Sequence, residues 1–346
     1  MKCTNKTHHL KIKLLCISCI AALFMNGCGT GKTADIQNPY SLTGDNSSVS
    51  SQFFARNLCV TDDINFGTDQ VHADYAEGAG VFDLTTKEVL YSQNLFEKLY
   101  PASTTKILTA YIIIRNCDLD DKVTVSADAI ANMADSSKCG LAAGDVLTVR
   151  DLLYGLLLVS GNDAANVLAE YYSGSIDKFA EEMNREAKAL GATQSHFVNA
   201  NGLPDPNHYT SAHDMALIMQ ECIKNETFCR IESDLTYTIQ PTNMTSTPRD
   251  LQNHHALLFQ DGQWGYKGAF AGKTGYTDEA HNTLVTAAKR GNMTLVCVVL
   301  TCDNLDYIND TRTVLDFGYD NFTHYTLKNA KKESLSGVVT LPKNAK

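Results

Sequence analysis

Two periods of apolar positions occur along the chain, and each change of period marks a change of predicted structure. Residues 78–94, GAGVFDLTTKEVLYSQN, alternate apolar and polar positions around a Thr-Thr pair, which predicts a β-hairpin. The alternation returns after Gly272 in the segments KTGYT, NTLVTAAKR and MTLVCVVLT, with a Gly291-Asn292 turn before the last of them. Strands are therefore expected at both ends of a folded region that begins near Ala73.

Helical patterns fill the region between these strands. PASTTKILTAYIIIRN, residues 101–116, predicts a long apolar helix with Ser103 in its first turn. Residues 149–159 are nearly all apolar and predict a buried helix that Thr148 caps and that ends at Ser160-Gly161-Asn162. Further helices are predicted at residues 163–172, at residues 177–191, and after a capping box formed by Ser211 and Asp214.

The order of hairpin, helices and strands predicts an α+β fold. An antiparallel sheet built from both chain ends has to be covered, and the helices between its strands are the segments able to cover it. We expect this fold over residues 69–321. Residues 322–346 form a polar, lysine-bearing segment with no apolar helical face, and a short C-terminal tail is predicted there.

The N-terminal residues 1–27 differ from the rest of the chain. Four lysines and no acidic residue precede LLCISCIAALFM, residues 14–25, an apolar run too short to span a bilayer comfortably. Small polar residues follow it. This is the pattern of a secretory signal peptide, so the protein is predicted to be exported.

The end of this segment, Phe24-Met25-Asn26-Gly27-Cys28, resembles a bacterial lipobox, in which a small residue precedes a lipidated cysteine. Met25 stands where that box prefers leucine, and ordinary cleavage nearby is the alternative. Lipidation of Cys28 attaches several alkyl chains, enough for a stable anchor on the outer face of the cytoplasmic membrane. Residues 28–68, rich in small and polar residues, are then a flexible tether.

Composition restricts the classes of protein to which the chain can belong. Apolar residues make up 44% of the chain and charged residues 20%, which is ordinary for a globular protein. The net charge of −10 argues against a nucleic-acid partner, because phosphate binding needs basic clusters. Of the 11 cysteines, those beyond Cys28 show no Cys-x-x-Cys spacing, which excludes zinc ribbons and redox motifs. A Cys222–Cys229 bridge and free buried thiols both remain open.

Ser103 and Lys106 are the first candidates for chemistry. A serine hydroxyl becomes a nucleophile when a nearby base takes its proton, and residues i and i+3 share one face of a helix. Lys106 serves as that base when neutral, which requires burial or a second cation. Alone, the pattern favours an ordinary capped helix, and a second Ser-x-x-Lys at Ser175–Lys178 shows how common it is.

Two further motifs follow in the chain. Ser160-Gly161-Asn162 offers a hydroxyl for proton relay and an amide for orientation, although a helix-breaking turn is the simpler explanation. Lys273-Thr274-Gly275 starts a strand and offers an ammonium and a hydroxyl to a carboxylate, as well as a second cation near Lys106. Together the three motifs fall in the order and on the elements found in penicillin-recognising serine enzymes. The Ser175–Lys178 pair fits neither.

On these residues the chain resembles the D-alanyl-D-alanine carboxypeptidases of the low-molecular-mass penicillin-binding proteins, peptidase S11 type. The resemblance runs from about Ala73 to Asn321 and includes YPASTTKILTA, DLLYGLLLVSGNDAANVLAE, SHFVNANGLPDPNHYTSAHDMA and GKTGYTDEAHNTLVTAAKR. It implies a penicillin-binding and serine β-lactamase-like fold, with an antiparallel sheet packed against a helical cluster. One departure is Asn253-His254-His255, where the family often has Asn-x-Asn.

The resemblance also implies roles for the catalytic residues. Ser103, with neutral Lys106 as base, would attack the carbonyl between the two terminal D-alanines of a peptidoglycan stem pentapeptide. Ser160 would pass a proton to the leaving amine, and Asn162 would orient Lys106 and a substrate amide. Water would then hydrolyse the acyl-enzyme, whereas β-lactam antibiotics would act as covalent inhibitors.

Substrate-binding roles follow for the third motif. Lys273 and Thr274 would hold the terminal carboxylate, and Gly275 would allow close backbone approach. The N–H groups of Ser103 and Tyr276 would form the oxyanion hole. No metal or cofactor is expected, and the adjacent histidines His254 and His255 are predicted not to be metal ligands.

Other functions use parts of the same set. A class A β-lactamase needs a glutamate after Ser-x-Asn, and residues 195–203, SHFVNANGL, contain no acid, which disfavours that function. A D,D-endopeptidase that cuts peptidoglycan cross-links uses the same catalytic residues. A non-catalytic lipoprotein that binds cell-wall peptide is the alternative from a different class.

Overall fold

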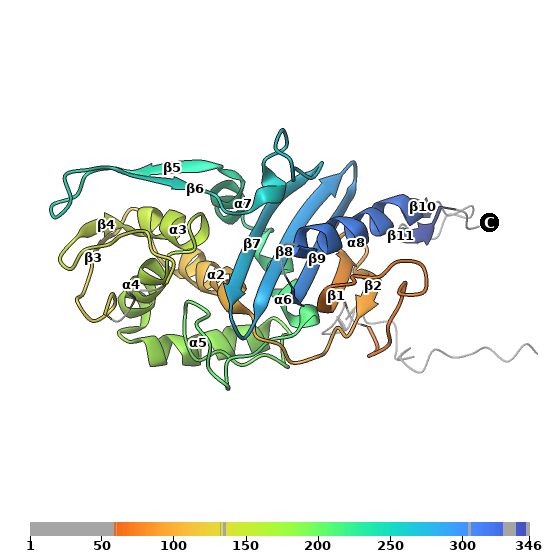
Figure 1. Cartoon of the computed structure of the whole chain (residues 1–346), viewed down its shortest axis with the longest axis horizontal. Helices are drawn as coiled ribbons and strands as arrows, with labels where there is room; N and C mark the ends of the chain where they lie inside the picture. The colour runs from red at the N-terminus through yellow and green to blue at the C-terminus, as the bar shows by residue number, and fades with distance from the viewer. Residues whose placement is uncertain are drawn as a thin grey trace, which may run out of the picture. The chain divides into compact units, whose positions relative to one another are not determined.

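A five-stranded antiparallel sheet forms the centre of the described chain (Figure 1). Its strand order is β2-β1-β9-β8-β7, so the N-terminal hairpin pairs with the last strand of the C-terminal meander. The strands are β1 (Ala76–Asp83), β2 (Glu88–Gln93), β7 (Ala269–Thr277), β8 (His281–Arg290) and β9 (Met293–Cys302). The predicted sheet from both chain ends is confirmed, and with it the α+β class.

This computed structural model describes residues 59, 61–131, 133, 136–303, 306–327 and 337–343. The predicted signal peptide and Cys28 lie outside the described residues, as does most of the predicted tether. No described helix combines the length and the apolar character that a membrane span requires.

The central strand β9 separates two hydrophobic cores. Val296, Val298 and Leu300 point into the larger core, whereas Leu295 and Val299 point into the smaller one. Successive strand residues face opposite sides, so a strand buried on both faces has to be apolar at every position. Helix α8 (Tyr307–Asn321) covers the smaller core and α6 (Ala212–Cys222) packs on the other face of the sheet (Figure 1).

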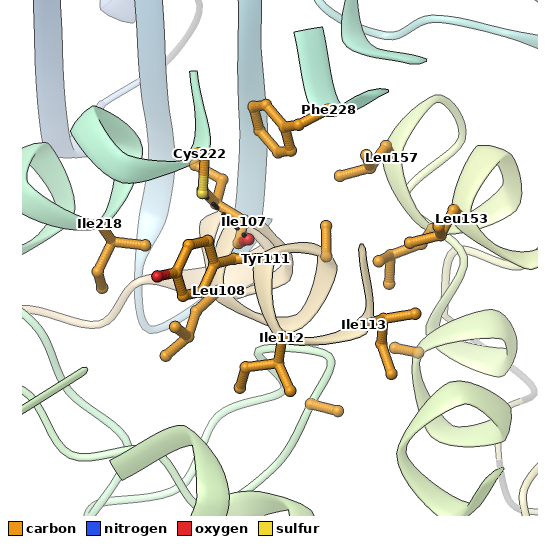
Figure 2. Close-up of a cluster of buried hydrophobic side chains, with 14 of the residues drawn as sticks. Ile107, Leu108, Tyr111, Ile112, Ile113, Leu153, Leu157, Ile218, Cys222 and Phe228 are labelled. Carbon is orange, nitrogen blue, oxygen red and sulfur yellow. Dashed lines mark hydrogen bonds between the residues drawn. The ribbon is translucent and has the colours of Figure 1, made fainter. Parts of the chain in front are cut away.

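The larger core is a helical cluster around one helix. The helices are α2 (Lys106–Asn116), α3 (Val149–Leu157), α4 (Asn162–Ser173), α5 (Ile176–Ala189) and α7 (Glu226–Ser233). Side chains of α3, α6 and α7 surround Ile107, Leu108, Ile112 and Ile113 of α2 (Figure 2). Because α2 has apolar contacts on nearly all sides, it reads as an apolar run without a polar face.

The helix starts differ from prediction in two details. Ser103 lies in a 3₁₀ turn, η1 (Ala102–Thr105), immediately before α2 rather than in the first turn of the α-helix. Ser211 accepts the N–H of Asp214 as a cap, but the carboxylate of Asp214 accepts from Gln194 N and Ser195 Oγ. The structure therefore has half of the predicted capping box, whereas Thr148 forms a complete one with Asp151.

Short elements that the sequence did not predict complete the fold. They are β3 (Lys122–Thr124) with β4 (Val146–Thr148), β5 (Thr236–Ile239) with β6 (Arg249–Gln252), β10 (Phe322–Leu327) with β11 (Gly337–Pro342), and the 3₁₀ turn η2 (Ala256–Leu258). Strands β10 and β11 lie within the segment 322–346 that was predicted to be a short C-terminal tail. The Asp83 carboxylate at the end of β1 accepts from Thr340 Oγ1 at 2.7 Å and lies 2.6 Å from His324 Nε2.

Ordered structure also begins earlier than the predicted start near Ala73. Cys59 is buried and its carbonyl lies 3.0 Å from His213 Nε2, and the backbone of Phe66 pairs with Ser92 of β2. These are contacts between residues far apart in the sequence. The segment before Ala73 has no regular pattern of apolar positions, so the sequence alone did not predict them.

Candidate active site

A cleft of about 600 Å³ brings the three sequence motifs together. Its lining includes Ser103, Ser160, Asn162, Thr274, Gly275 and Tyr276. The two motif lysines, Lys106 and Lys273, lie beneath this lining and are 0% and 1% exposed. The helical cluster thus contributes the first two motifs and the edge strand β7 contributes the third.

The turn that carries Ser103 is held in an unusual backbone conformation. Ala102 has φ +48°, which a residue with a side chain seldom adopts. Thr283 Oγ1 on β8 donates to the carbonyl of Pro101 at 3.0 Å. A Cβ on Gly202 would lie 1.9 Å from the carbonyl oxygen of Ala102, and one on Gly275 would lie 2.8 Å from Ser103 N. The surrounding backbone therefore fits closely against the turn and keeps it strained.

Lys106 Nζ is surrounded by three oxygen atoms. It lies 2.9 Å from Ser103 Oγ, 2.7 Å from Asn162 Oδ1 and 2.6 Å from the carbonyl of Asn201. A neutral amine has two N–H bonds and one lone pair. When Asn162 and Asn201 accept those two N–H bonds, the lone pair faces the hydroxyl of Ser103, which is the geometry of a general base.

The surroundings also favour the neutral amine. Burial lowers the pKa of Lys106 well below its ordinary value, and the charge of Lys273 lowers it further. The Asp163 carboxylate acts in the opposite direction but has a smaller effect on this pKa. Lys273 therefore lies where a second cation helps to keep Lys106 unprotonated.

Lys273 is buried next to the cleft residue Thr274. Its ammonium donates to the carbonyl of Thr274 at 2.8 Å, and Thr274 is the member of the pair that lines the cleft. The predicted contact of Lys273 with a substrate carboxylate stays a prediction.

Ser160 occupies a strained position opposite this strand. Its φ is +58°, its hydroxyl is buried, and that hydroxyl has no hydrogen-bond partner among the described residues. Helix α4 begins two residues later at Asn162, which places the Ser160 hydroxyl and the Asn162 amide side by side in the lining. Buried polar groups usually have a hydrogen-bond partner, so the unpartnered hydroxyl of Ser160 is free to bond to a group that enters the cleft.

Several residues of the site were not predicted. The carboxylate of Asp163 accepts the N–H groups of Cys139, Gly140 and Leu141 and so fixes the segment that follows the cleft residue Ser137. Asn201, in the segment SHFVNANGL, supplies its backbone carbonyl to Lys106. Every residue has a carbonyl, so no residue type signals such a contact.

The remaining candidates have structural roles. Ser175 caps α5 by accepting the N–H of Lys178, so this Ser-x-x-Lys is a helix start. The cysteines of the described chain are free, and Cys222 Sγ contacts the carbonyl of Ile107 (Figure 2). Burial raises the pKa of each of these thiols: Cys59, Cys117, Cys139, Cys222, Cys229, Cys297 and Cys302.

The two adjacent histidines differ in environment. His254 lines the cleft, whereas His255 is buried and its Nε2 lies 2.9 Å from Thr286 Oγ1. Burial lowers the pKa of both, that of His255 to about 3, so His255 is neutral at ordinary pH. Within the described ranges no group of three His, Cys, Asp or Glu side chains is arranged to hold a metal ion.

Comparison with known proteins supports one family. The family model described as D-alanyl-D-alanine carboxypeptidase matches residues 67–304. The chain is 36% identical over 261 residues to the D-alanyl-D-alanine carboxypeptidase DacF of Bacillus subtilis. The aligned region covers 74% of this chain and 65% of that protein. It is 36% identical over 248 residues to the D-alanyl-D-alanine carboxypeptidase DacB2 of Mycobacterium tuberculosis. This aligned region covers 69% of this chain and 80% of that protein.

Solved structures agree with these matches. Penicillin binding protein 6B from Escherichia coli superposes with a TM-score of 0.69 at 32% identity, covering 78% of this chain and 85% of that one. A variant of the Streptomyces K15 DD-transpeptidase gives a TM-score of 0.67 at 31% identity, covering 71% and 98%. At these identities the likeness extends to the fold of the whole matched region.

Replacing Lys273 by glutamine tests the electrostatic coupling of the two lysines. Loss of this cation is expected to raise the pKa of Lys106, because a nearby like charge disfavours the protonated amine. Carbon-13 NMR of Cε-labelled lysines measures that pKa, with Lys106→Arg to assign the signal. Lys289→Gln, at an exposed lysine of β8, is the control. An unchanged pKa in Lys273→Gln would show that burial alone depresses it.

Proposed function

Because the chain belongs to the D-alanyl-D-alanine carboxypeptidase family of serine peptidases, we propose that it removes the terminal D-alanine from peptidoglycan stem pentapeptides. The reaction proceeds through an acyl-enzyme on Ser103. The observation that carries this proposal is the buried amine of Lys106, which is held against Ser103 Oγ by Asn162 and Asn201.

In the acylation step, Ser103 Oγ bonds to the carbonyl carbon of the penultimate D-alanine while its proton moves to Lys106 Nζ. The oxyanion that forms accepts hydrogen bonds from the N–H groups of Ser103 and Tyr276. The close fit of Gly275 against Ser103 N supports this pairing, because it places β7 beside the nucleophile. Each such donor contributes about 3–4 kcal/mol to the transition state in other enzymes.

The leaving group then needs a proton. The ammonium of Lys106 returns the proton taken from Ser103, and the free hydroxyl of Ser160 passes it to the amine of the departing D-alanine as the C–N bond breaks. Water next attacks the ester carbonyl and gives up a proton by the same route, and the Ser103 hydroxyl is restored. The two steps are the two halves of covalent catalysis by an activated serine.

The terminal carboxylate of the substrate is held by Thr274 and by the charge behind it. The Thr274 hydroxyl belongs to the cleft lining, and the buried ammonium of Lys273 lies directly beneath that residue. A charge in a site that excludes water acts over a longer range than one in solution. Lys273 and Thr274 together therefore hold the carboxylate in this proposal.

Covalent labelling tests the nucleophile. A fluorescent penicillin is expected to label the protein, because the β-lactam carbonyl replaces the substrate carbonyl, and Ser103→Ala is expected to abolish the label. Gel fluorescence measures it. Ser175→Ala removes the serine of the other Ser-x-x-Lys and is expected to leave labelling unchanged. Label that survives in Ser103→Ala refutes the assignment.

The substrate is tested with two cell-wall peptides. Release of D-alanine from a stem pentapeptide, and no cleavage of a cross-linked peptide dimer, is the result expected for a carboxypeptidase. Mass spectrometry separates the two products. Cleavage of the dimer instead indicates an endopeptidase, and binding of either peptide without turnover indicates a non-catalytic lipoprotein.

Export and anchoring belong to the same proposal. The sequence of residues 1–28 supports a cleaved signal peptide and a lipid on Cys28, which together put the enzyme beside its cell-wall substrate. Cys28→Ser is expected to move the protein from the membrane fraction to the soluble fraction. Immunoblotting of fractionated cells measures this, with Cys59→Ser as the matched control. A Cys28→Ser protein that stays in the membrane fraction excludes lipidation there as the attachment.

A further inference from the structure

Glu232 is a fully buried acid that the mechanism above does not use. It lies on α7, which packs against β7, and its side chain is 0% exposed. Glu232 Oε2 accepts the N–H of Gly272 at 3.3 Å, and Glu232 Oε1 has no hydrogen-bond partner among the described residues. Because β7 is the edge strand of the sheet, Glu232 occupies an N–H that no neighbouring strand takes.

The only residue between this N–H and the cleft residue Thr274 is Lys273. Its side chain is 1% exposed, so the buried ammonium of β7 follows directly after the backbone N–H that the buried carboxyl group of α7 contacts. An isolated buried charge costs several kcal/mol, and a nearby opposite charge offsets that cost. A charged carboxylate at Glu232 would offset part of the cost of burying Lys273.

We propose that Glu232 is a positioning residue that keeps Lys273 protonated beneath the cleft. Through Lys273 it controls the attraction of the substrate carboxylate to Thr274. The inference rests on the proposed function, since it concerns the charge that this reaction needs. It assigns to α7 a part in the active site, although no residue of α7 lines the cleft.

Burial shifts the pKa of both groups toward the neutral form, and the charge of each partner acts against that shift. Burial lowers the pKa of Lys273, and the Glu232 carboxylate raises it again. Burial raises the pKa of Glu232, and the Lys273 ammonium lowers it. Each group thus favours the charged form of the other.

Other titratable groups surround the pair without replacing it. Both histidines next to Lys273 have lowered pKa values and supply no negative charge, and the two nearest thiols have raised pKa values and stay protonated. These groups are His254, His255, Cys222 and Cys229. On the side of the cleft, Lys106 and Asp163 complete the set of charged groups. Glu232 is the group whose charge raises the pKa of Lys273.

Glu232→Gln separates charge from structure. A glutamine side chain has the same size and still offers an oxygen to the N–H of Gly272, but it has no charge. Without the carboxylate the pKa of Lys273 falls, so Lys273 loses its proton at a lower pH. The alkaline limb of the pH profile, which reports loss of that proton, then moves to lower pH, while the acid limb, which reports Lys106, stays in place.

The measurement is the second-order rate constant for labelling of Ser103 by a fluorescent penicillin, taken from about pH 5 to about pH 10. This range is wide enough to resolve a shift of about one pH unit. A penicillin carries a carboxylate like that of the substrate. We expect the alkaline limb of the Glu232→Gln profile to lie about one pH unit or more below that of the wild type. At a pH above the alkaline limbs of both proteins, the variant is then labelled about tenfold more slowly than the wild type. Glu226→Gln, an exposed acid in the first turn of the same helix, is expected to keep the wild-type profile.

A double variant shows whether Glu232 acts through Lys273. Lys273→Gln has no ammonium left to titrate, so adding Glu232→Gln to it is expected to change the shape of the profile no further. A merely structural role would instead lower the rate by the same factor at every pH. If Glu232→Gln does not fold, Glu232→Asp keeps a carboxyl but withdraws it by one methylene, and a smaller shift of the limb in the same direction is expected.

The outcomes separate this inference from the proposed function. Labelling of Ser103 with an unchanged alkaline limb in the Glu232 variants overturns the role of Glu232 and leaves the serine peptidase intact. Absence of any labelling in the wild-type protein overturns the proposed function itself.

Discussion

A lysine amine without access to water is the feature on which the site depends. Lys106 begins α2 three residues after Ser103, and the apolar side chains of α2 and its neighbours remove the solvent that would favour its charge. Strand β7 completes the site by bringing Lys273 beneath the cleft. The helical cluster and the sheet are therefore both required, because neither one alone holds a neutral base against a serine.

Local patterns were enough to predict most of the fold. The hairpin and the meander are predicted by apolar residues at every second position, and the long helices are predicted by apolar runs. The β10–β11 hairpin was not predicted, because it is held by contacts such as Thr340 with Asp83 that join residues far apart in the chain. Propensity carries no information about such partners.

The site shows the same division. Ser103, Asn162 and Thr274 were identified because short motifs specify residue types, and the cleft brings them together. Asn201 acts through its backbone carbonyl, and Glu232 acts from behind the lining, so neither forms a recognisable motif. The burial of Lys273 could not be predicted either, because it depends on which elements pack around β7.

The free thiols of the described residues have a consequence for how the fold is held. Each lies in surroundings that disfavour the thiolate, and the thiolate is the form that attacks a disulfide or an oxidant. The packed cores thus replace covalent cross-links as the source of stability. Within the described residues the fold is therefore held without disulfides, and its thiols have little tendency to react with an oxidant.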